Sequence, residues 1–201
     1  MKTSKKIVIA TNNLNKLYEF RKLFKDTDYE ILTLNDIGFL GEIEETGETF
    51  AENAIIKAEA IAKFSKLPVI ADDSGLMVNA LDGFPGIYSR RFMEDASYVL
   101  KNQEIIHRLE PYSDKSAKFV AAIALVNYEK FPQVFIGEVK GLIIDEPHGE
   151  SGFGYDPIFF VPKLNKTLAE ASDEEKNKIS HRGKALDLLI AFLNATPPAT
   201  L

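Results

Sequence analysis

Two adjacent carboxylates follow a short apolar run in the stretch "VIADDSGL", residues 69–76. The run before them predicts a short buried strand that ends at Asp72 and Asp73. Like charges side by side repel each other, and a carboxylate next to a buried strand is unfavourable unless it has a partner. The pair is therefore a candidate site for holding a cation, at an edge of a sheet.

A second pair of acids, Glu44 and Glu45, stands in "EIEETGE" before a predicted helix. Together with Asp72 and Asp73, these side chains offer the oxygen ligands that Mg²⁺ takes. Mg²⁺ usually binds one or two carboxylates beside substrate phosphates and water. A run of acids in a loop is more often a solvated surface, so this pair alone does not establish a site.

The stretch "IATNNLNK" has the composition of an anion site. A strand is predicted to end at Ala10 and a helix to begin near Asn15, and the free N–H groups of a helix start favour phosphate. Lys16 adds a full positive charge. An ordinary Asn helix cap with a solvated Lys gives the same pattern, and the stretch is not a Walker loop.

An aromatic, glycine-rich segment, "SGFGYDPIFF", is a candidate for binding a flat ring. Gly152 and Gly154 permit tight turns, and Phe153 and Tyr155 offer faces on which a nucleobase can stack. The alternative is a glycine-rich turn whose aromatic side chains are tucked into the core.

Three basic residues surround the start of the last predicted helix, in "EEKNKISHRGK". Arg182 offers planar donors to a keto oxygen or a phosphate, with Lys176 just upstream. His181 can equally cap the helix or fill the core. Lys57 lies one turn beyond Asn53 on an earlier helix, so the two share a face, although a surface Lys is the simpler interpretation.

The elements that must position these residues alternate between strand and helix patterns. Apolar residues at spacings of three and four predict a helix in "NKLYEFRKLFK" and another in "FAENAIIKAEAIAKF", which Thr49 and Glu52 begin as a capping box. "AKFVAAIALVNYE" and "QVFIGEVKGLIID" predict two long antiparallel strands, and "SHRGKALDLLIAFLNA" a final helix. The order predicts an α/β fold, an extended mixed β-sheet flanked by helices.

Composition limits the possible functions. The 201 residues are expected to form a single domain, 1–201, with residues 195–201 frayed. The absence of cysteine excludes disulfides and thiol catalysis, and no apolar run is long enough to span a membrane, so a cytoplasmic protein is expected. The net charge of −6 argues against a nucleic-acid partner but leaves room for a local basic pocket.

Together the patterns indicate a nucleotide polyphosphate site that uses Mg²⁺. At this point the chain resembles the inosine triphosphate pyrophosphatase family. The motifs that carry the resemblance are "IATNNLNKLYEF", "EETGETFAENAIIKA", "ADDSGL", "GFPGIYSRRF", "GFGYDPIFF" and "SHRGKALDLL", in the family's order. The resemblance implies hydrolysis of ITP, dITP and XTP to the monophosphate and pyrophosphate. It also implies a homodimer, and an elongated mixed sheet with two lobes and a central nucleotide-binding cleft.

The resemblance also implies roles for individual residues. It makes Asp73 the catalytic proton acceptor, with Asp72 in support, and Glu44 and Asp73 the metal ligands, with Glu45 as the neighbour of Glu44. The implied substrate contacts are Thr11, Asn12, Asn13, Leu14, Asn15 and Lys16 for the triphosphate, Lys57 and Ser74 beside them, Phe153, Gly154, Tyr155 and Asp156 for the base, and Lys176, His181 and Arg182 for base and phosphate.

The first loop departs from the family pattern at one position. The loop commonly has Thr-Gly-Asn, whereas here it has Thr11-Asn12-Asn13. Asn12 must then adopt whatever backbone angle the glycine adopts, which Asn tolerates better than most residues.

Selection among purines can be argued from the donors available. Hypoxanthine, xanthine and guanine carry an acceptor at position 6, where adenine carries a donor. Arg182 has only donors, and backbone N–H groups near His181 and Gly154 could act likewise, so adenine would be refused. Guanine must then be refused at position 2, where only it has an amino group, because that position is closed or lacks an acceptor.

Two other functions remain open on the sequence alone. Asp72 or Asp73 could be the nucleophile of a phosphatase that forms an aspartyl-phosphate and releases inorganic phosphate. The chain could also be a module that senses nucleotides without turnover. The products formed from ITP and Mg²⁺ distinguish all three.

Overall fold

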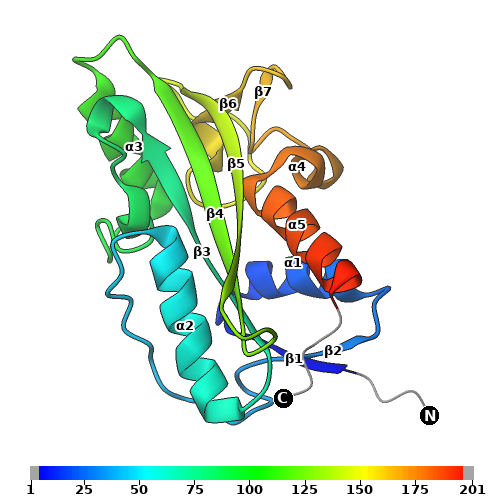
Figure 1. Ribbon diagram of the computed structural model, residues 1–201. Coiled ribbons are helices and arrows are strands. Elements are labelled where there is room, and N and C mark those ends of the chain that lie inside the picture. Colours follow the sequence, from blue (N-terminus) through cyan, green and yellow to red (C-terminus); the bar gives the residue numbers. More distant parts are fainter. Residues whose placement is uncertain (1–4, 197–201) are drawn as a thin grey trace. The chain divides into compact units, whose positions relative to one another are not determined.

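A mixed β-sheet forms the centre of the computed structural model, which describes residues 5–196, apart from the side chain of Asn177. Within that range the sheet has seven strands in the order β2-β1-β3-β4-β5-β6-β7 (Figure 1). Pairing is parallel between β1 and β2 and between β1 and β3, and antiparallel from β5 through β6 to β7. The strands are β1 Lys5–Ile9, β2 Tyr29–Leu32, β3 Val69–Val78, β4 Ser116–Val126, β5 Gln133–Ile143, β6 Phe159–Val161 and β7 Lys166–Thr167.

Helices flank this sheet, which confirms the predicted α/β class. They are α1 Leu14–Phe24, α2 Phe50–Ser65, α3 Tyr98–Leu109, α4 Asp173–Ile179 and α5 His181–Ala195. Short 3₁₀ turns lie at Asn79–Leu81, Gly86–Tyr88 and Asp156–Ile158. No helix in residues 5–196 combines the length and the apolar composition that crossing a membrane requires.

The two N-terminal helices form where their apolar spacing predicts them. The predicted face of α1 buries Leu17, Phe20 and Phe24, and α2 buries its apolar stripe of Ala54, Ala58, Ile61 and Ala62. β4 and β5 are neighbours in the sheet, and the connection through residues 127–132 is too short for a parallel crossover, so they pair antiparallel as predicted. At the C-terminus α5 includes Ala195, and residues 197–201 of the predicted frayed segment lie outside the described residues.

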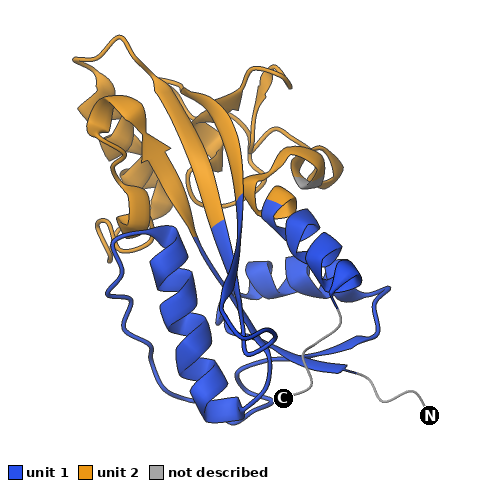
Figure 2. Ribbon diagram, in the orientation of Figure 1, with its two compact units in different colours: residues 1–73, 122–136, 185–201 blue, residues 74–121, 137–184 orange. Residues whose placement is uncertain are grey.

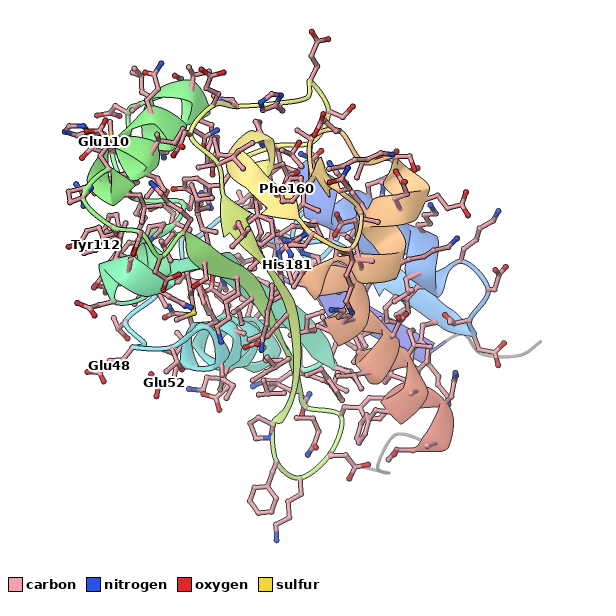
Figure 3. All side chains as sticks on the ribbon, turned by 90° about the horizontal axis from the view of Figure 1, so that it is seen from above. Glu48, Glu52, Glu110, Tyr112, Phe160 and His181 are labelled. Carbon is pink, nitrogen blue, oxygen red and sulfur yellow. The ribbon has the colours of Figure 1, made fainter. Side chains whose placement is uncertain are left out.

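The capping box predicted at the start of α2 is only half formed. Thr49 Oγ1 accepts a hydrogen bond from Glu52 N–H at 3.1 Å, as expected. The Glu52 carboxylate, however, accepts from the N–H of Glu48 at 2.7 Å rather than from Thr49; both Glu side chains are labelled in Figure 3. The preceding turn is held by Asn53, whose Oδ1 accepts from Gly47 N–H, and this turn brings Glu48 within reach.

The strand expected to end at the acid pair continues for five residues beyond it. β3 includes Asp72 and Asp73 near its middle, with Leu76 and Val78 buried further along. Its ladder with β1 ends at the pair Ile9 and Ile70, so the acids lie just past the point where β1 turns away. The prediction that this strand ends at Asp72 and Asp73 was therefore wrong. The strand that ends near this point is the neighbouring β1.

The chain divides into two compact units (Figure 2). Unit 1 contains residues 1–73, 122–136 and 185–201, and its core includes Val8, Ala54, Ile61 and Val69. Unit 2 contains residues 74–121 and 137–184, and its core is built around Leu76, Ile105, Phe119 and Phe159. The division falls between Asp73 and Ser74, within β3. The predicted site residues are therefore shared between two units.

Candidate functional site

Each carboxylate of the acid pair has a lysine partner in unit 1. Lys16 Nζ lies 3.0 Å from Asp72 Oδ1, whose side chain is fully buried. Lys57 Nζ lies 3.3 Å from Asp73 Oδ1 and 2.7 Å from Glu45 Oε1. These five residues are the carboxylate–lysine cluster of this protein.

The strand geometry explains why two adjacent acids are tolerated. Consecutive side chains of a strand point to opposite faces, so Asp72 and Asp73 are directed apart. Helices α1 and α2, which carry Lys16 and Lys57, lie on opposite sides of the sheet (Figure 1). Each face therefore supplies its own ammonium group, which offsets the repulsion that Asp72 still exerts on Asp73.

The loop between β1 and α1 fixes Lys16 through its backbone. Asn13 is the helix cap, and its Oδ1 accepts from the N–H groups of Asn15 and Lys16 at 3.0 and 3.3 Å. Thr11 Oγ1 in turn accepts from Asn13 N–H at 3.1 Å. The capping interpretation is thus correct for Asn13, but Lys16 is paired and only 16% exposed in its side chain rather than solvated. Asn12 has no positive φ, so the backbone at this position does not require glycine.

Burial and charge together set the protonation of the cluster. Burial raises the pKa of Asp73 above its ordinary value, because the ammonium groups of Lys57 and Lys16 only partly oppose this effect and the carboxylate of Glu45 adds to it. Burial lowers the pKa of Lys57, but the carboxylates of Asp73, Asp72 and Glu45 outweigh this effect and leave it raised. The result is a cationic Lys57 beside a carboxylate that is more basic than an ordinary Asp.

The carboxylates of the cluster fit a hard divalent cation. Asp73 Oδ2 is buried and has no hydrogen-bond partner among the described residues. Glu45, rather than the predicted ligand Glu44, contacts the cluster, since Glu44 is exposed. No three His, Asp or Glu side chains in residues 5–196 converge on one point, and Mg²⁺ does not need such a cage because water and substrate phosphates complete its shell.

In unit 2, the loop from Gly152 to Asp156 is held in a tight turn; it is called the base loop below, after the role that the family resemblance implies for it. Gly152 and Gly154 have φ values of +85° and +69°, which favour glycine. Asp156 Oδ2 accepts from Phe153 N–H and pairs with Lys176 Nζ, both at 3.2 Å. A side chain at Gly152 would collide with both Asp156 and Lys176. Asp156 and Lys176 therefore shape the loop.

The pKa of Asp156 reflects this position. Burial raises the pKa of Asp156 above its ordinary value, against the opposing effects of the Lys176 ammonium, the Phe153 N–H and the Arg182 guanidinium.

The two aromatic residues of the base loop differ in exposure. Tyr155 is buried: its hydroxyl donates to Ser89 O at 2.7 Å, and its ring meets Tyr98 edge-on at a centroid distance of 5.5 Å. Phe153 is 44% exposed. The interpretation of a tucked aromatic thus holds for Tyr155, and Phe153 is the residue that can offer a free face.

The start of α5 contributes a buried guanidinium to unit 2. Arg182 is 3% exposed, and its Nη2 donates to Ser74 Oγ at 3.0 Å. His181, labelled in Figure 3, stacks on Phe119 with ring centroids 5.0 Å apart and planes 14° apart. Arg182 and Ser74, two of the predicted site residues, are therefore in contact, while the His181 ring packs on the core strand β4.

Two buried asparagines belong to these clusters and were not among the predicted site residues. Asn53 of α2 accepts from Gly47 N–H at 2.8 Å, in the loop that follows Glu45. Asn102 of α3 donates to Gly154 O at 3.3 Å. Each lies on the apolar face of a helix, beside Ala54 or three residues before Ile105, and a polar residue on such a face was the available signal.

An open depression elsewhere in unit 2 does not coincide with the predicted site. It has a volume of about 530 Å³, and its lining includes Ile144, Glu146, His148, Phe160 and Glu170. None of the predicted site residues lines it. The clusters above, and not this depression, hold the residues singled out by their chemistry.

Known proteins resemble the chain over most of its length. The model of the Ham1 family matches residues 7–192. The dITP/XTP pyrophosphatase of Staphylococcus aureus strain MW2 is 47% identical over 190 residues, which cover 94% of this chain and 96% of that protein.

Solved structures agree with this match. The Staphylococcus aureus Ham1 protein has a TM-score of 0.89 and 47% identity, and the alignment covers 95% of this chain and 99% of that one. A HAM1 protein from Coxiella burnetii has a TM-score of 0.91 and 42% identity, with coverage of 96% and 100%. The match confirms the resemblance inferred from the motifs: this chain belongs to the Ham1 family.

Proposed function

We propose that this protein hydrolyses the non-canonical purine nucleotides ITP, dITP and XTP to the monophosphate and pyrophosphate, with Mg²⁺ as cofactor. The observation that carries the proposal is the buried Asp73, whose pKa is raised and whose Oδ2 has no hydrogen-bond partner in the described residues. Relatives that bear the name dITP/XTP pyrophosphatase support the same reaction.

In this proposal the unit 1 cluster acts on the triphosphate. Lys16 and Lys57 supply ammonium groups to phosphate oxygens, and the loop from Thr11 to Asn15 contributes backbone and hydroxyl groups at the start of α1. Asp73 accepts a proton from the attacking water, because a carboxylate of raised pKa is a better base near neutral pH. The bond between the α- and β-phosphates breaks, and pyrophosphate leaves.

The residues proposed to hold Mg²⁺ are Asp73 and Glu45, with Glu44 as the ligand that the family resemblance implies. A bound Mg²⁺ neutralises charge on the phosphate oxygens. Asp72, paired with Lys16, keeps that lysine in place before the nucleotide arrives.

The unit 2 residues are proposed to recognise the base. Phe153 offers a face for stacking, and Arg182 offers donors to the keto oxygen at position 6. Asp156 and Lys176 keep the base loop in its turn, and Ser74 holds the guanidinium of Arg182. A homodimer that acts on the cytoplasmic nucleotide pool completes the proposal, in accordance with the family resemblance.

Identification of the products tests the reaction. Purified protein is incubated with ITP and Mg²⁺, and IMP, IDP, phosphate and pyrophosphate are quantified, with Asp73→Asn as the matched control. The proposal expects equal amounts of IMP and pyrophosphate from the wild type. Formation of phosphate and IDP instead would indicate a phosphatase. Binding of ITP without any product would indicate a sensing module. Full activity in excess chelator would contradict the proposed requirement for Mg²⁺.

A further inference from the structure

Two buried asparagines each bind the backbone of a loop glycine, one by accepting a hydrogen bond and the other by donating one. Asn53, fully buried in unit 1, accepts the N–H of Gly47 through Oδ1, and its Nδ2 has no hydrogen-bond partner among the described residues. Asn102, 3% exposed in unit 2, donates through Nδ2 to the carbonyl of Gly154, and its Oδ1 has no such partner. The glycine backbone group in each contact fixes which amide atom faces it.

Helix α3 contacts two consecutive residues of the base loop, Gly154 and Tyr155. Tyr98 and Asn102 are four residues apart, so they lie on one face of α3. Tyr98 packs edge-on against Tyr155, and Asn102 binds the carbonyl of Gly154. A side chain at Gly154 would also lie 3.6 Å from the Tyr98 ring, so Tyr98 borders both residues.

The Gly154 carbonyl is an acceptor in this loop that could defeat selection against common purines. Guanine and adenine carry exocyclic amino groups, which donate hydrogen bonds, whereas hypoxanthine and xanthine carry none. A carbonyl available in the base loop would accept from an amino group and so favour the common bases. A carbonyl can accept two hydrogen bonds, so the one from Asn102 does not exhaust it, but this bond directs the carbonyl toward α3 and holds it there.

We propose that Asn102 is a positioning residue that excludes amino purines by directing the Gly154 carbonyl toward α3 and away from the base. The loop then presents donors, such as its N–H groups, while its Gly154 carbonyl is directed toward α3 rather than toward the base. This inference rests on the proposed function, because it assumes that the loop from Gly152 to Asp156 contacts the base. Asn102 acts through Gly154 and does not itself touch the substrate.

Two variants of Asn102 remove the donor in different ways. Asn102→Ala frees the carbonyl, and Asn102→Asp keeps the size of the side chain but faces the carbonyl with a carboxylate. The value of kcat/KM is measured for ITP, XTP, GTP and ATP, with thermal unfolding of each variant as a check of folding. The GTP-to-ITP ratio of kcat/KM is expected to rise about tenfold or more in both variants.

The Asp variant adds a readout that a purely structural role would not give. A carboxylate buried against a carbonyl has a raised pKa, and once protonated it donates a hydrogen bond as the amide did. Acidification should therefore restore the low GTP-to-ITP ratio in Asn102→Asp, while the ratio in Asn102→Ala does not change with pH. Other groups that titrate in this pH range and affect kcat/KM for GTP and ITP equally do not change the ratio.

Asn53→Ala is the matched control, since it also removes a half-satisfied buried amide that holds a loop glycine. It is expected to lower kcat/KM for all four nucleotides by a common factor and to leave their ratios unchanged. The inference is overturned if the Asn102 variants lower all four equally, or if Asn53→Ala changes the ratios as much. If the wild type makes no pyrophosphate from ITP, the proposed function is refuted. If the wild type prefers ITP and both Asn102 variants keep its GTP-to-ITP ratio of kcat/KM, only this inference is refuted.

Discussion

The carboxylate–lysine cluster and the base loop are proposed to recognise different parts of the nucleotide, and they differ in their chemical groups. In unit 1 the groups are full charges on side chains, three carboxylates and two ammonium ions. In unit 2 they are backbone groups, aromatic faces and the buried guanidinium of Arg182, and the charged pair of Asp156 and Lys176 shapes the loop. Every nucleoside triphosphate has the same phosphates, so charge suits a step common to all, whereas fixed donors and acceptors suit a choice between bases.

This contrast predicts two classes of variant. Changes in unit 1 should alter the rate for all nucleotides together, and changes in unit 2 should alter the ratios between them. A unit 1 variant that changes base preference, or a unit 2 variant that only slows every nucleotide, would break the division.

The largest effect is expected from Asp73→Asn, which removes the proposed base. Turnover of ITP should fall by about a hundredfold to ten-thousandfold, and turnover of GTP by the same factor. Steady-state kcat for both nucleotides, with binding of a non-hydrolysable ITP analogue by calorimetry, checks this. Retention of more than about a tenth of wild-type turnover would show that Asp73 is neither base nor essential ligand.

A smaller but selective loss is expected from Arg182→Ala. The guanidinium is buried against Ser74, so its removal should lower kcat/KM for ITP by about ten- to a hundredfold, the usual worth of a charged hydrogen bond. The ITP-to-ATP ratio should narrow, while the ITP-to-GTP ratio should stay closer to its original value. Ser74→Ala is the control for loss of the internal contact alone, and a uniform loss across ITP, XTP, GTP and ATP would assign Arg182 to phosphate binding or structure.

Lys16→Ala should weaken binding of triphosphates by about tenfold and that of monophosphates less. The ammonium is proposed to serve the phosphate tail, and its loss also leaves Asp72 buried without this partner. Dissociation constants for an ITP analogue and for IMP, compared with those of the double variant Lys16→Ala/Asp72→Asn, separate the two causes. Equal weakening of both ligands would remove Lys16 from the phosphate site.

The smallest effect concerns the two adjacent glutamates. Glu45→Gln should raise the Mg²⁺ concentration needed for half-maximal rate more than Glu44→Gln does, because only Glu45 contacts Lys57 beside Asp73. Metal titrations of ITP turnover in both variants provide the comparison. A larger shift in Glu44→Gln would restore the ligand that the family resemblance implies.

The sequence predicted those parts of the fold whose patterns are local. The apolar spacing of α1 and α2 marks their buried faces, and the long apolar runs of β4 and β5 mark two neighbouring strands. The course of β3 was missed because two acids followed by Ser and Gly look like the end of a strand. The lysines that stabilise those acids are distant in sequence, so no local pattern reveals them.

Within the clusters, the sequence identified residue types but not their orientations. It could not tell that Glu45 rather than Glu44 meets Lys57, or that Tyr155 is buried while Phe153 is exposed. Both distinctions depend on how a loop turns between neighbouring residues. Asn102 was missed because its hydrogen bond is to a backbone carbonyl 52 residues away.

The uninterrupted course of β3 through the acid pair has a consequence for how this protein can change over evolution. Alternation along a strand means that a single inserted or deleted residue before Asp72 would send each carboxylate to the other face of the sheet. One of the two lysines would then lose its carboxylate partner, because Ala71 would take the place of Asp72 after an insertion and Ser74 the place of Asp73 after a deletion. The spacing from Val69 to Asp73 should therefore admit no change in length, even where the apolar residues within it can be exchanged for one another.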